Sequence, residues 1–211
     1  MAEVKEQCPV SLDIDYSESA DKLTTFFRIF TVIPIFIILA LLIGGNNETH
    51  SSVEGCKSIC YGGGFVFFPT LLMILFREKY PKWWFDWNVS LTKFSTRVFS
   101  YLLLLRHEYP STEEEQAVHI EIPYPDVKEE LHRGMPLVKW FLAIPHIIIL
   151  CFLYIAVAIC TIISWFAILF TGNYPRGLFD FVVGVIRWSL RVSAYAFLLT
   201  TDRYPPFKLS E

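Results

Sequence analysis

The chain of 211 residues has none of the short motifs that identify the commonest enzyme classes. The triple glycine at residues 62–64 is not followed by the Lys and the Ser or Thr that a phosphate-binding loop requires. The sequence also contains no Ser nucleophile elbow and no helix motif with paired His residues. These absences predict a protein that is not an enzyme and that carries no metal and no cofactor.

The chain also has little excess of charge of one sign, and we expect no secretion signal peptide. The chain has 18 Lys and Arg against 21 Asp and Glu, a net charge of -3, and its basic residues are scattered beside apolar segments. This scatter argues against a basic surface for nucleic acid. Residues 1–22 hold six acidic groups and no apolar core, so we expect the N-terminus to be retained rather than cleaved as a signal peptide.

Apolar residues are abundant and come in long blocks. They make up 54% of the chain, and the two largest blocks are residues 23–44 and 137–170. The first block has the roughly 20 residues that cross a hydrocarbon core, whereas the second is too long for one crossing without a steep tilt. We expect two crossings in the second block. The alternative is one long helix kinked at Pro145, which the lack of Gly or Pro between Ile147 and Thr171 favours.

The chain also repeats itself. Residues 10–16 (VSLDIDY) return as residues 118–124 (VHIEIPY), and residues 30–34 (FTVIP) return as residues 141–145 (FLAIP). A further set recurs with unchanged spacing: Ser95, Arg97, Val98 and Tyr101 as Ser189, Arg191, Val192 and Tyr195. Agreement at several places in one order predicts a tandem duplication, with repeat 1 at residues 1–110 and repeat 2 at residues 111–211. Such halves commonly place a shared interface or pathway between them.

The offsets between the repeats locate an insertion. Pro34 and Pro145 are 111 residues apart, whereas Tyr80 and Tyr174 are 94 apart, so repeat 1 carries 17 extra residues, at about 45–62. That stretch is polar and turn-rich, which is typical of a solvated loop, and insertions are best tolerated at exposed loop tips. The flanking apolar stretches therefore read as the two arms of a transmembrane helical hairpin.

Each repeat ends in an apolar segment with a polar stripe. Residues three or four apart share one helix face, and the stripe residues that we single out as candidate lipid or partner contacts are Asp86, Lys93, Arg97, Tyr101, Asp180, Arg187, Arg191 and Tyr195. Aromatic residues occupy the remaining faces. An aromatic body with a basic stripe is typical of an amphipathic helix in the membrane interface.

Residues 10–16 and 118–124 alternate apolar and polar side chains, which predicts a half-buried strand before each repeat. If both strands lie on one side of the membrane, they could pair with each other. The predicted fold class is therefore an all-α integral membrane protein with tandem duplication. Each copy comprises a transmembrane helical hairpin and an amphipathic interfacial helix, preceded by a short strand-like segment.

The positive charges predict the orientation of this fold. With four crossings, Lys57 is the one residue among the 18 Lys and Arg that lies outside the cytoplasm. The positive-inside rule then places both termini in the cytoplasm of a multi-pass protein in an inner or plasma membrane. Six crossings with inverted repeats are the alternative. Cys56 and Cys60 in the predicted outer loop could form a disulfide in an oxidising compartment, or could be free thiols.

One part of the chain resembles a known family. Residues 166–181 (FAILFTGNYPRGLFDF), with the upstream Ile144-Pro145-His146 and the downstream residues 202–207 (DRYPPF), resemble a prokaryotic integral-membrane family catalogued only as a domain of unknown function. The resemblance covers repeat 2 nearly end to end, and repeat 1 matches it more loosely. It implies membrane location and repetition and brings no activity.

Two hypotheses of function follow. The leading one is a non-enzymatic membrane protein that acts through contacts, as an accessory or scaffolding subunit of a larger membrane assembly. Its partners are the lipid bilayer and membrane proteins or further copies of itself, and nucleic acid is not among them. The alternative is a small transporter or channel with a pathway between the two repeats, motivated by the charged residues within apolar segments. His146 has no second ligand at metal spacing in its segment, so we expect a hydrogen-bonded structural histidine.

Overall fold

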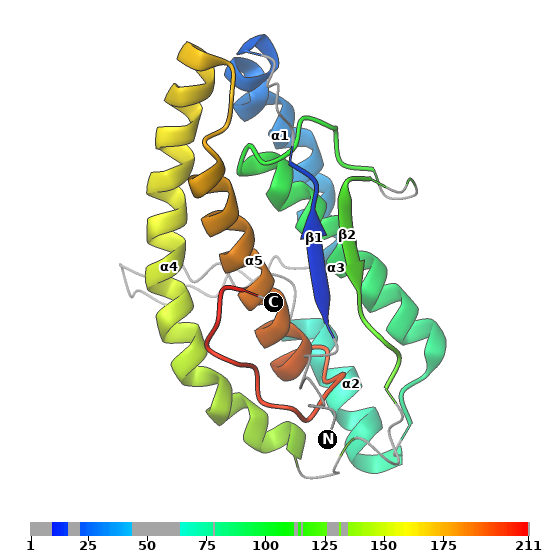
Figure 1. The fold of residues 1–211 in the computed structure, drawn as a ribbon. Coiled ribbons are helices and arrows are strands. Elements are labelled where there is room, and N and C mark those ends of the chain that lie inside the picture. The colour runs from blue at the N-terminus through cyan, green and yellow to red at the C-terminus, as the bar shows by residue number, and fades with distance from the viewer. Residues whose placement is uncertain are drawn as a thin grey trace, which may run out of the picture.

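The computed structural model describes residues 10–16, 22–43, 64–77, 79–111, 114, 116–125, 131 and 135–210. Figure 1 shows the helices and strands of this part of the chain, which are β1 (Ser11–Ile14), α1 (Lys22–Ile43), α2 (Gly64–Arg77), α3 (Lys82–Leu102), β2 (Val118–Glu121), α4 (Met135–Thr171) and α5 (Arg176–Ala196). The fold is mostly helical, as expected, with a small two-stranded sheet. The predicted insertion at about 45–62 and the cysteines Cys56 and Cys60 lie outside the described residues.

The hairpin that we expected in the second apolar block is wrong. Residues Met135–Thr171 form one helix of 37 residues, with Pro145 inside it. The physical reason is visible in the sequence, because no residue between Ile147 and Thr171 breaks a helix, and an unbroken run keeps its backbone hydrogen bonds by continuing. The alternative of one long helix is the one that forms. Figure 1 shows α4 as a curved helix that bends around the shorter α5.

The first apolar block does not form a packed hairpin either. α1 and α2 stand on the two sides of residues 44–63, yet α1 packs against α3 and α4 rather than along α2 (Figure 1). α2 lies beyond the end of α1, near the start of α3. α1 and α2 thus lie one beyond the other along the molecule, as the last and first parts of the continuous helix α4 do.

The elements close around a common core. α4 packs on α5, α5 on β1, β1 on β2, β2 on α3, α3 on α1 and α1 on α4. The ribbon of β1 and β2 therefore lies on the face opposite α1 and α4, with α3 and α5 between (Figure 1). Between these layers the largest cluster of buried apolar side chains joins the inner face of the ribbon to α5 and α4.

The two predicted strands pair with each other, which confirms the prediction from their alternation. β1 and β2 are antiparallel, and Leu12 lies opposite Ile120. These two residues are also counterparts in the repeated sequence, since both stand third in their seven-residue segments. The next pairs outward, Ser11 with Glu121 and Asp13 with His119, exchange places under the same equivalence. The register is the one that a twofold axis through the Leu12 and Ile120 pair requires.

Tertiary contacts recur between the halves in the same way. The Tyr16 hydroxyl donates to the backbone oxygen of Tyr174, and the Tyr124 hydroxyl donates to that of Tyr80. An edge-to-face ring pair accompanies each bond. The ring centroids are 5.1 Å apart for Tyr16 and Phe179, and 5.1 Å apart for Tyr124 and Phe85. Each tyrosine thus reaches from the strand segment of one half to the start of the last helix of the other half.

One helix among the described residues is long and apolar enough to cross a membrane. Val138–Thr171 meets both conditions, and only 17% of its most apolar window is buried inside the protein. In the first half, Lys22–Arg28 and Phe30–Ala40 meet the conditions only when taken together as one bent span. Among the described residues, α4 and α1 thus both carry many exposed apolar side chains.

Candidate functional site

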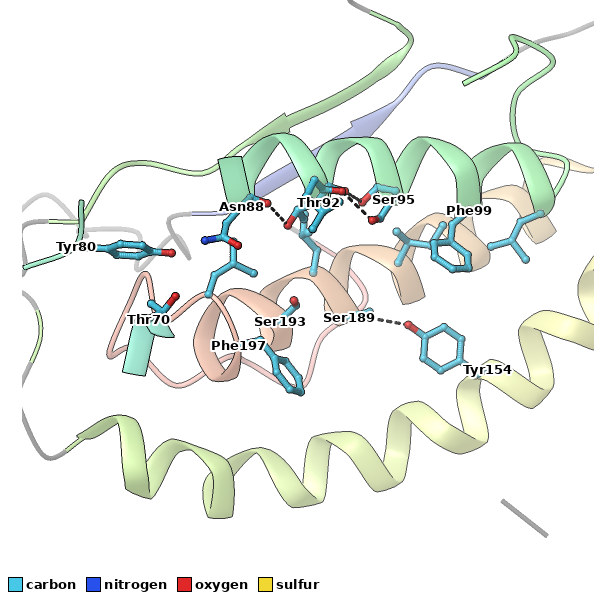
Figure 2. A pocket seen from close by; sticks show the side chains of 16 residues that line it. Thr70, Tyr80, Asn88, Thr92, Ser95, Phe99, Tyr154, Ser189, Ser193 and Phe197 are labelled. Carbon is cyan, nitrogen blue, oxygen red and sulfur yellow. Dashed lines mark hydrogen bonds between the residues drawn. The ribbon is translucent and has the colours of Figure 1, made fainter. Parts of the chain in front are cut away.

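A cavity of about 160 Å³ lies between α3 and α5 (Figure 2). Its walls come from both helices, with Tyr154 of α4 at one end and Tyr80 and Thr70 at the other. Ser95 and Ser189 are both in the wall, and they are counterparts in the repeated sequence. The cavity therefore lies where the two halves meet.

The polar groups of this cavity are neutral hydroxyls and one amide, Asn88. Thr92, Ser95 and Thr96 each donate a hydrogen bond to the carbonyl four residues earlier, at 2.8–2.9 Å. Their protons are therefore engaged within α3, and the hydroxyl oxygens keep lone pairs that face the cavity as acceptors. A cavity of this kind suits water or a small neutral molecule with a hydrogen-bond donor.

Tyrosines close the cavity at its ends. The Tyr154 hydroxyl forms a 2.6 Å hydrogen bond with Ser189 Oγ (Figure 2). Burial raises the pKa of Tyr80 at the other end to about 12, so its phenol stays protonated at neutral pH. Among the residues that the structure describes, those that line the cavity are all uncharged. Its walls therefore present hydroxyl, amide and apolar groups.

The predicted stripe on α5 faces the ribbon and the C-terminal segment. Arg187 donates two hydrogen bonds to the backbone oxygen of Leu12, at 2.9 and 3.0 Å. Arg191 donates to the carbonyls of Lys208 and Ser210. Asp180 is exposed, and with Arg187 it lines an open pocket beside β1. These arginines therefore secure β1 and the C-terminal segment to α5.

Tyr195, the last residue of that stripe, is buried. It lies under the Lys139 ammonium, whose nitrogen is 5.3 Å from the centre of the tyrosine ring. Burial raises the pKa of Tyr195, and the nearby carboxylate of Asp202 raises it further. Tyr195 thus belongs to a buried charged cluster and not to the outer surface.

The stripe on α3 is arranged in a similar way. Asp86 is exposed, Lys93 is half-buried, and Arg97 donates to the backbone oxygen of Ser111 at 2.9 Å. Tyr101 is buried and shares a 2.8 Å hydrogen bond with Thr31 of α1. The structure therefore does not gather the eight stripe residues into one site. Each set instead joins its helix to other segments of the chain, and Arg97 and Arg187 each donate to a carbonyl of the other half.

Two buried cations escaped the sequence analysis. Arg28 of α1 lies 4.4 Å above the Tyr101 ring and donates to the Arg106 carbonyl and to His107 Nδ1. Lys139 of α4 has no exposed surface and pairs with Asp202 at 2.7 Å. Their signal was available, because each is a single cation inside an apolar block and the two are 111 residues apart, the offset of Pro34 and Pro145.

His146 lies in an aromatic environment. Its ring is fully buried, stacks on Phe207 with centroids 4.0 Å apart, and accepts a 3.2 Å hydrogen bond from Trp188 Nε1 at Nδ1. Within the part of the chain that the structure describes, its Nε2 has no hydrogen-bond partner. Within the described residues, no three His, Cys, Asp or Glu side chains gather as metal ligands. The expected hydrogen bond to His146 is present.

Comparison with known families bears on the second half of the chain. Residues 135–208 match the family model of a domain of unknown function, DUF4389. The match covers α4, α5 and the C-terminal segment, which is the part for which we expected such a family. Searches of curated proteins and of solved structures found no match.

Proposed function

We propose that this is a membrane-embedded, non-enzymatic protein that works through contacts, as an accessory or scaffolding subunit of a larger membrane assembly. One observation carries the proposal, which is the inverted polarity of α4. Its inward side buries Lys139 and His146 completely, while Phe141, Phe152 and Phe170 on its outward side are 75%, 69% and 80% exposed. A helix in water places its polar side chains outward. Lipid or another apolar surface reverses that preference.

α1 shows the same inversion. Thr25 and Arg28 are buried against the rest of the protein, whereas Leu23 and Phe30 are 71% and 67% exposed. Continuous apolar surface of this extent marks a membrane or a protein interface. The two helices form neighbouring parts of one outer layer, because Phe26 of α1 stacks on Trp165 of α4. One environment is therefore expected to cover both.

The matched contacts of the two halves support a tandem duplication, with repeats at 1–110 and 111–211. The strand register, the paired tyrosine bonds and the buried cations all recur at counterpart positions. A scaffolding role agrees with the use of the arginines, whose guanidinium groups hold backbone carbonyls of their own chain. These arginine side chains thus stabilise the fold of their own chain.

We place the protein in a prokaryotic inner or plasma membrane with both termini in the cytoplasm. The support for the membrane is the resemblance of repeat 2 to a prokaryotic integral-membrane family, and the Lys and Arg residues that border the apolar blocks favour the cytoplasmic side. A multi-pass arrangement was the first expectation from the sequence. With α4 continuous, that arrangement requires α4 itself to cross the bilayer.

The proposal is tested by purification of the tagged chain in mild detergent from the native membrane, after a carbonate wash. We expect the chain to resist the wash and to carry a partner protein at fixed stoichiometry. Charge reversal of the two exposed acids among the candidate partner contacts, Asp86→Lys and Asp180→Lys, should release the partner, whereas Lys82→Glu at the exposed start of α3 should not. Extraction by carbonate, or recovery of the chain without any partner protein, would falsify the proposal.

The second candidate is a small transporter with its pathway between the repeats. The cavity between α3 and α5 favours it, because paired serines from both halves line it. The charged residues that motivated a pathway, Asp86, Arg97, Asp180 and Arg191, are not in its wall. Solute uptake by vesicles that contain the chain tests this candidate. Uptake abolished by Ser95→Trp but kept in Ser90→Trp, whose side chain is exposed, would establish it.

A further inference from the structure

We infer that α1 and α4 lie along the membrane within one leaflet, so that α4 does not cross the bilayer. The ribbon of β1 and β2 then faces water on the same side of the membrane as the starts of α3 and α5. The occupant of the apolar face is the acyl layer of that leaflet. The inference rests on the proposed membrane location and specifies how the protein sits in it.

The position of the ribbon relative to α4 carries the argument. Tyr154, at the middle of α4, contacts Ser189 of α5, and Arg187, two residues earlier in α5, contacts Leu12 of β1. The ribbon thus lies level with the middle of α4, on the opposite face of the molecule (Figure 1). If α4 crossed the bilayer, its middle would lie at the bilayer centre, and the ribbon would lie there too.

The ribbon is not suited to that depth. Its outward side chains are Ser11, Asp13, His119 and Glu121, all exposed, and His119 lies 3.6 Å from Asp15 with more than half of each side chain in contact with solvent. Ionisable side chains that face hydrocarbon are strongly disfavoured. A two-stranded sheet also leaves unpaired strand edges, which lipid cannot satisfy. The ribbon therefore requires water at the level of the middle of α4.

The length of α4 agrees with a position along the membrane. From Phe141 to Phe170 the helix rises about 43 Å at 1.5 Å per residue, whereas the hydrocarbon core is about 30 Å thick. Both of these end residues are among the most exposed apolar side chains of the molecule. An upright helix would place at least one of them outside the hydrocarbon core, and the tilt needed to bury both exceeds the usual range. A helix along the leaflet keeps both in lipid.

The two arrangements differ in where the starts of α3 and α5 lie. These starts are at opposite ends of the molecule (Figure 1). Their exposed counterpart positions are Trp83, which is 69% exposed, and Gly177, where an added Cβ meets no atom within 4 Å. Single cysteines at these positions, in a chain whose five native cysteines are replaced by alanine, report the side of the membrane.

Intact cells that make each variant are treated with a membrane-impermeant maleimide, before and after permeabilisation. We expect Trp83→Cys, Gly177→Cys and His119→Cys to behave alike. All three should stay unlabelled in intact cells, because the water-facing side is the cytoplasmic one, and all three should be labelled after permeabilisation. Labelling of one helix start in intact cells and of the other only after permeabilisation would overturn the inference. Carbonate extraction of the cysteine-free chain is the control that its membrane association is intact.

A depth measurement gives an independent result. Nitroxide labels at Phe141, Phe152 and Phe170 in phosphatidylcholine and phosphatidylglycerol vesicles report depth through their relative accessibility to oxygen and to a water-soluble nickel complex. We expect three similar depths within the hydrocarbon. A deep central label between two shallow ends shows a crossing helix, and overturns the inference while leaving the proposed membrane function standing. Labels that remain in water overturn the proposed function itself.

Discussion

The two halves of the molecule share a scaffold and differ in how they neutralise a buried cation. In the first half, Arg28 stacks on Tyr101 and donates to a backbone carbonyl and to His107. In the second half, Lys139 occupies the counterpart position and pairs with the carboxylate of Asp202 at 2.7 Å. His107 and Asp202 each stand two residues before a Tyr-Pro pair, so they are counterparts as well.

The two halves thus both bury a cation at the counterpart position, but the side chain that neutralises or binds this cation differs between them. A guanidinium spreads its charge over a plane, is weakly hydrated and stacks well on an aromatic ring, so it tolerates burial without a carboxylate. An ammonium is a compact, strongly hydrated charge. The Lys139 ammonium is therefore expected to depend on Asp202 more than Arg28 depends on His107.

A second difference between the halves lies where His146 of α4 meets Trp188 of α5. His146 of α4 accepts a hydrogen bond from Trp188 of α5, and in the first half the counterpart positions are the apolar residues Ile35 and Phe94. Ile35 and Phe94 belong to one buried apolar cluster. A polar pair and an apolar pair thus fill equivalent places, each matched within itself. The exchange of both members together indicates that this place in the fold requires a matched pair, polar or apolar, and not either residue alone.

The largest expected effect comes from removing the counterion in the second half. Asp202→Asn should lower the free energy of unfolding by about 3–5 kcal/mol, because it leaves the fully buried Lys139 ammonium without a carboxylate. His107→Asn in the first half should lower it by about 1 kcal/mol, since it removes one neutral acceptor from Arg28. Unfolding of the protein in mild detergent, followed by circular dichroism, measures both.

Arg203→Asn is the matched control, because Arg203 is exposed and adjacent to Asp202. It should leave stability within about 0.5 kcal/mol of the parent chain. Equal losses for the Asp202 and His107 variants would show that the two halves handle their cations alike, contrary to the comparison.

Much of the architecture was accessible from the sequence, for identifiable reasons. The pairing of β1 with β2 follows from strict alternation in two similar segments, and the positions of α3 and α5 follow from helical spacing of their polar stripes. The hairpin within residues 137–170 was wrong because block length was weighed above the lack of a turn residue. Length alone does not say whether an apolar helix crosses a bilayer or lies in it.

The site was less accessible, because it depends on which helix faces meet. The arginines at 187 and 191 were read as facing lipid headgroups, yet they donate to backbone carbonyls of β1 and of the C-terminal segment. The helical spacing of the polar residues on α5 does not indicate that a strand 175 residues earlier in the chain covers them. The lining of the cavity between α3 and α5 was missed for the same reason.

A smaller effect is expected from the polar pair. Trp188→Phe alone should cost about 1–3 kcal/mol, because it leaves the buried His146 Nδ1 without its donor. Adding His146→Ile, which recreates the apolar pair of the first half, should recover part of that loss. Unfolding of both single variants and the double variant gives the coupling energy. Additive losses would show that the two side chains do not act as a pair.

The smallest expected effect tests whether the halves are equivalent where their contacts are the same. Tyr16→Phe and Tyr124→Phe each remove one hydroxyl that donates to a backbone carbonyl, of Tyr174 and Tyr80 respectively, and keep the edge-to-face ring contact. Each should lower the free energy of unfolding by about 0.5–1.5 kcal/mol, by closely similar amounts. The two bonds share no partner, so the losses in the double variant should add. A loss confined to one tyrosine would mean that only one of these crossed contacts holds its strand segment, and that the twofold relation of the two halves does not extend to their energetics.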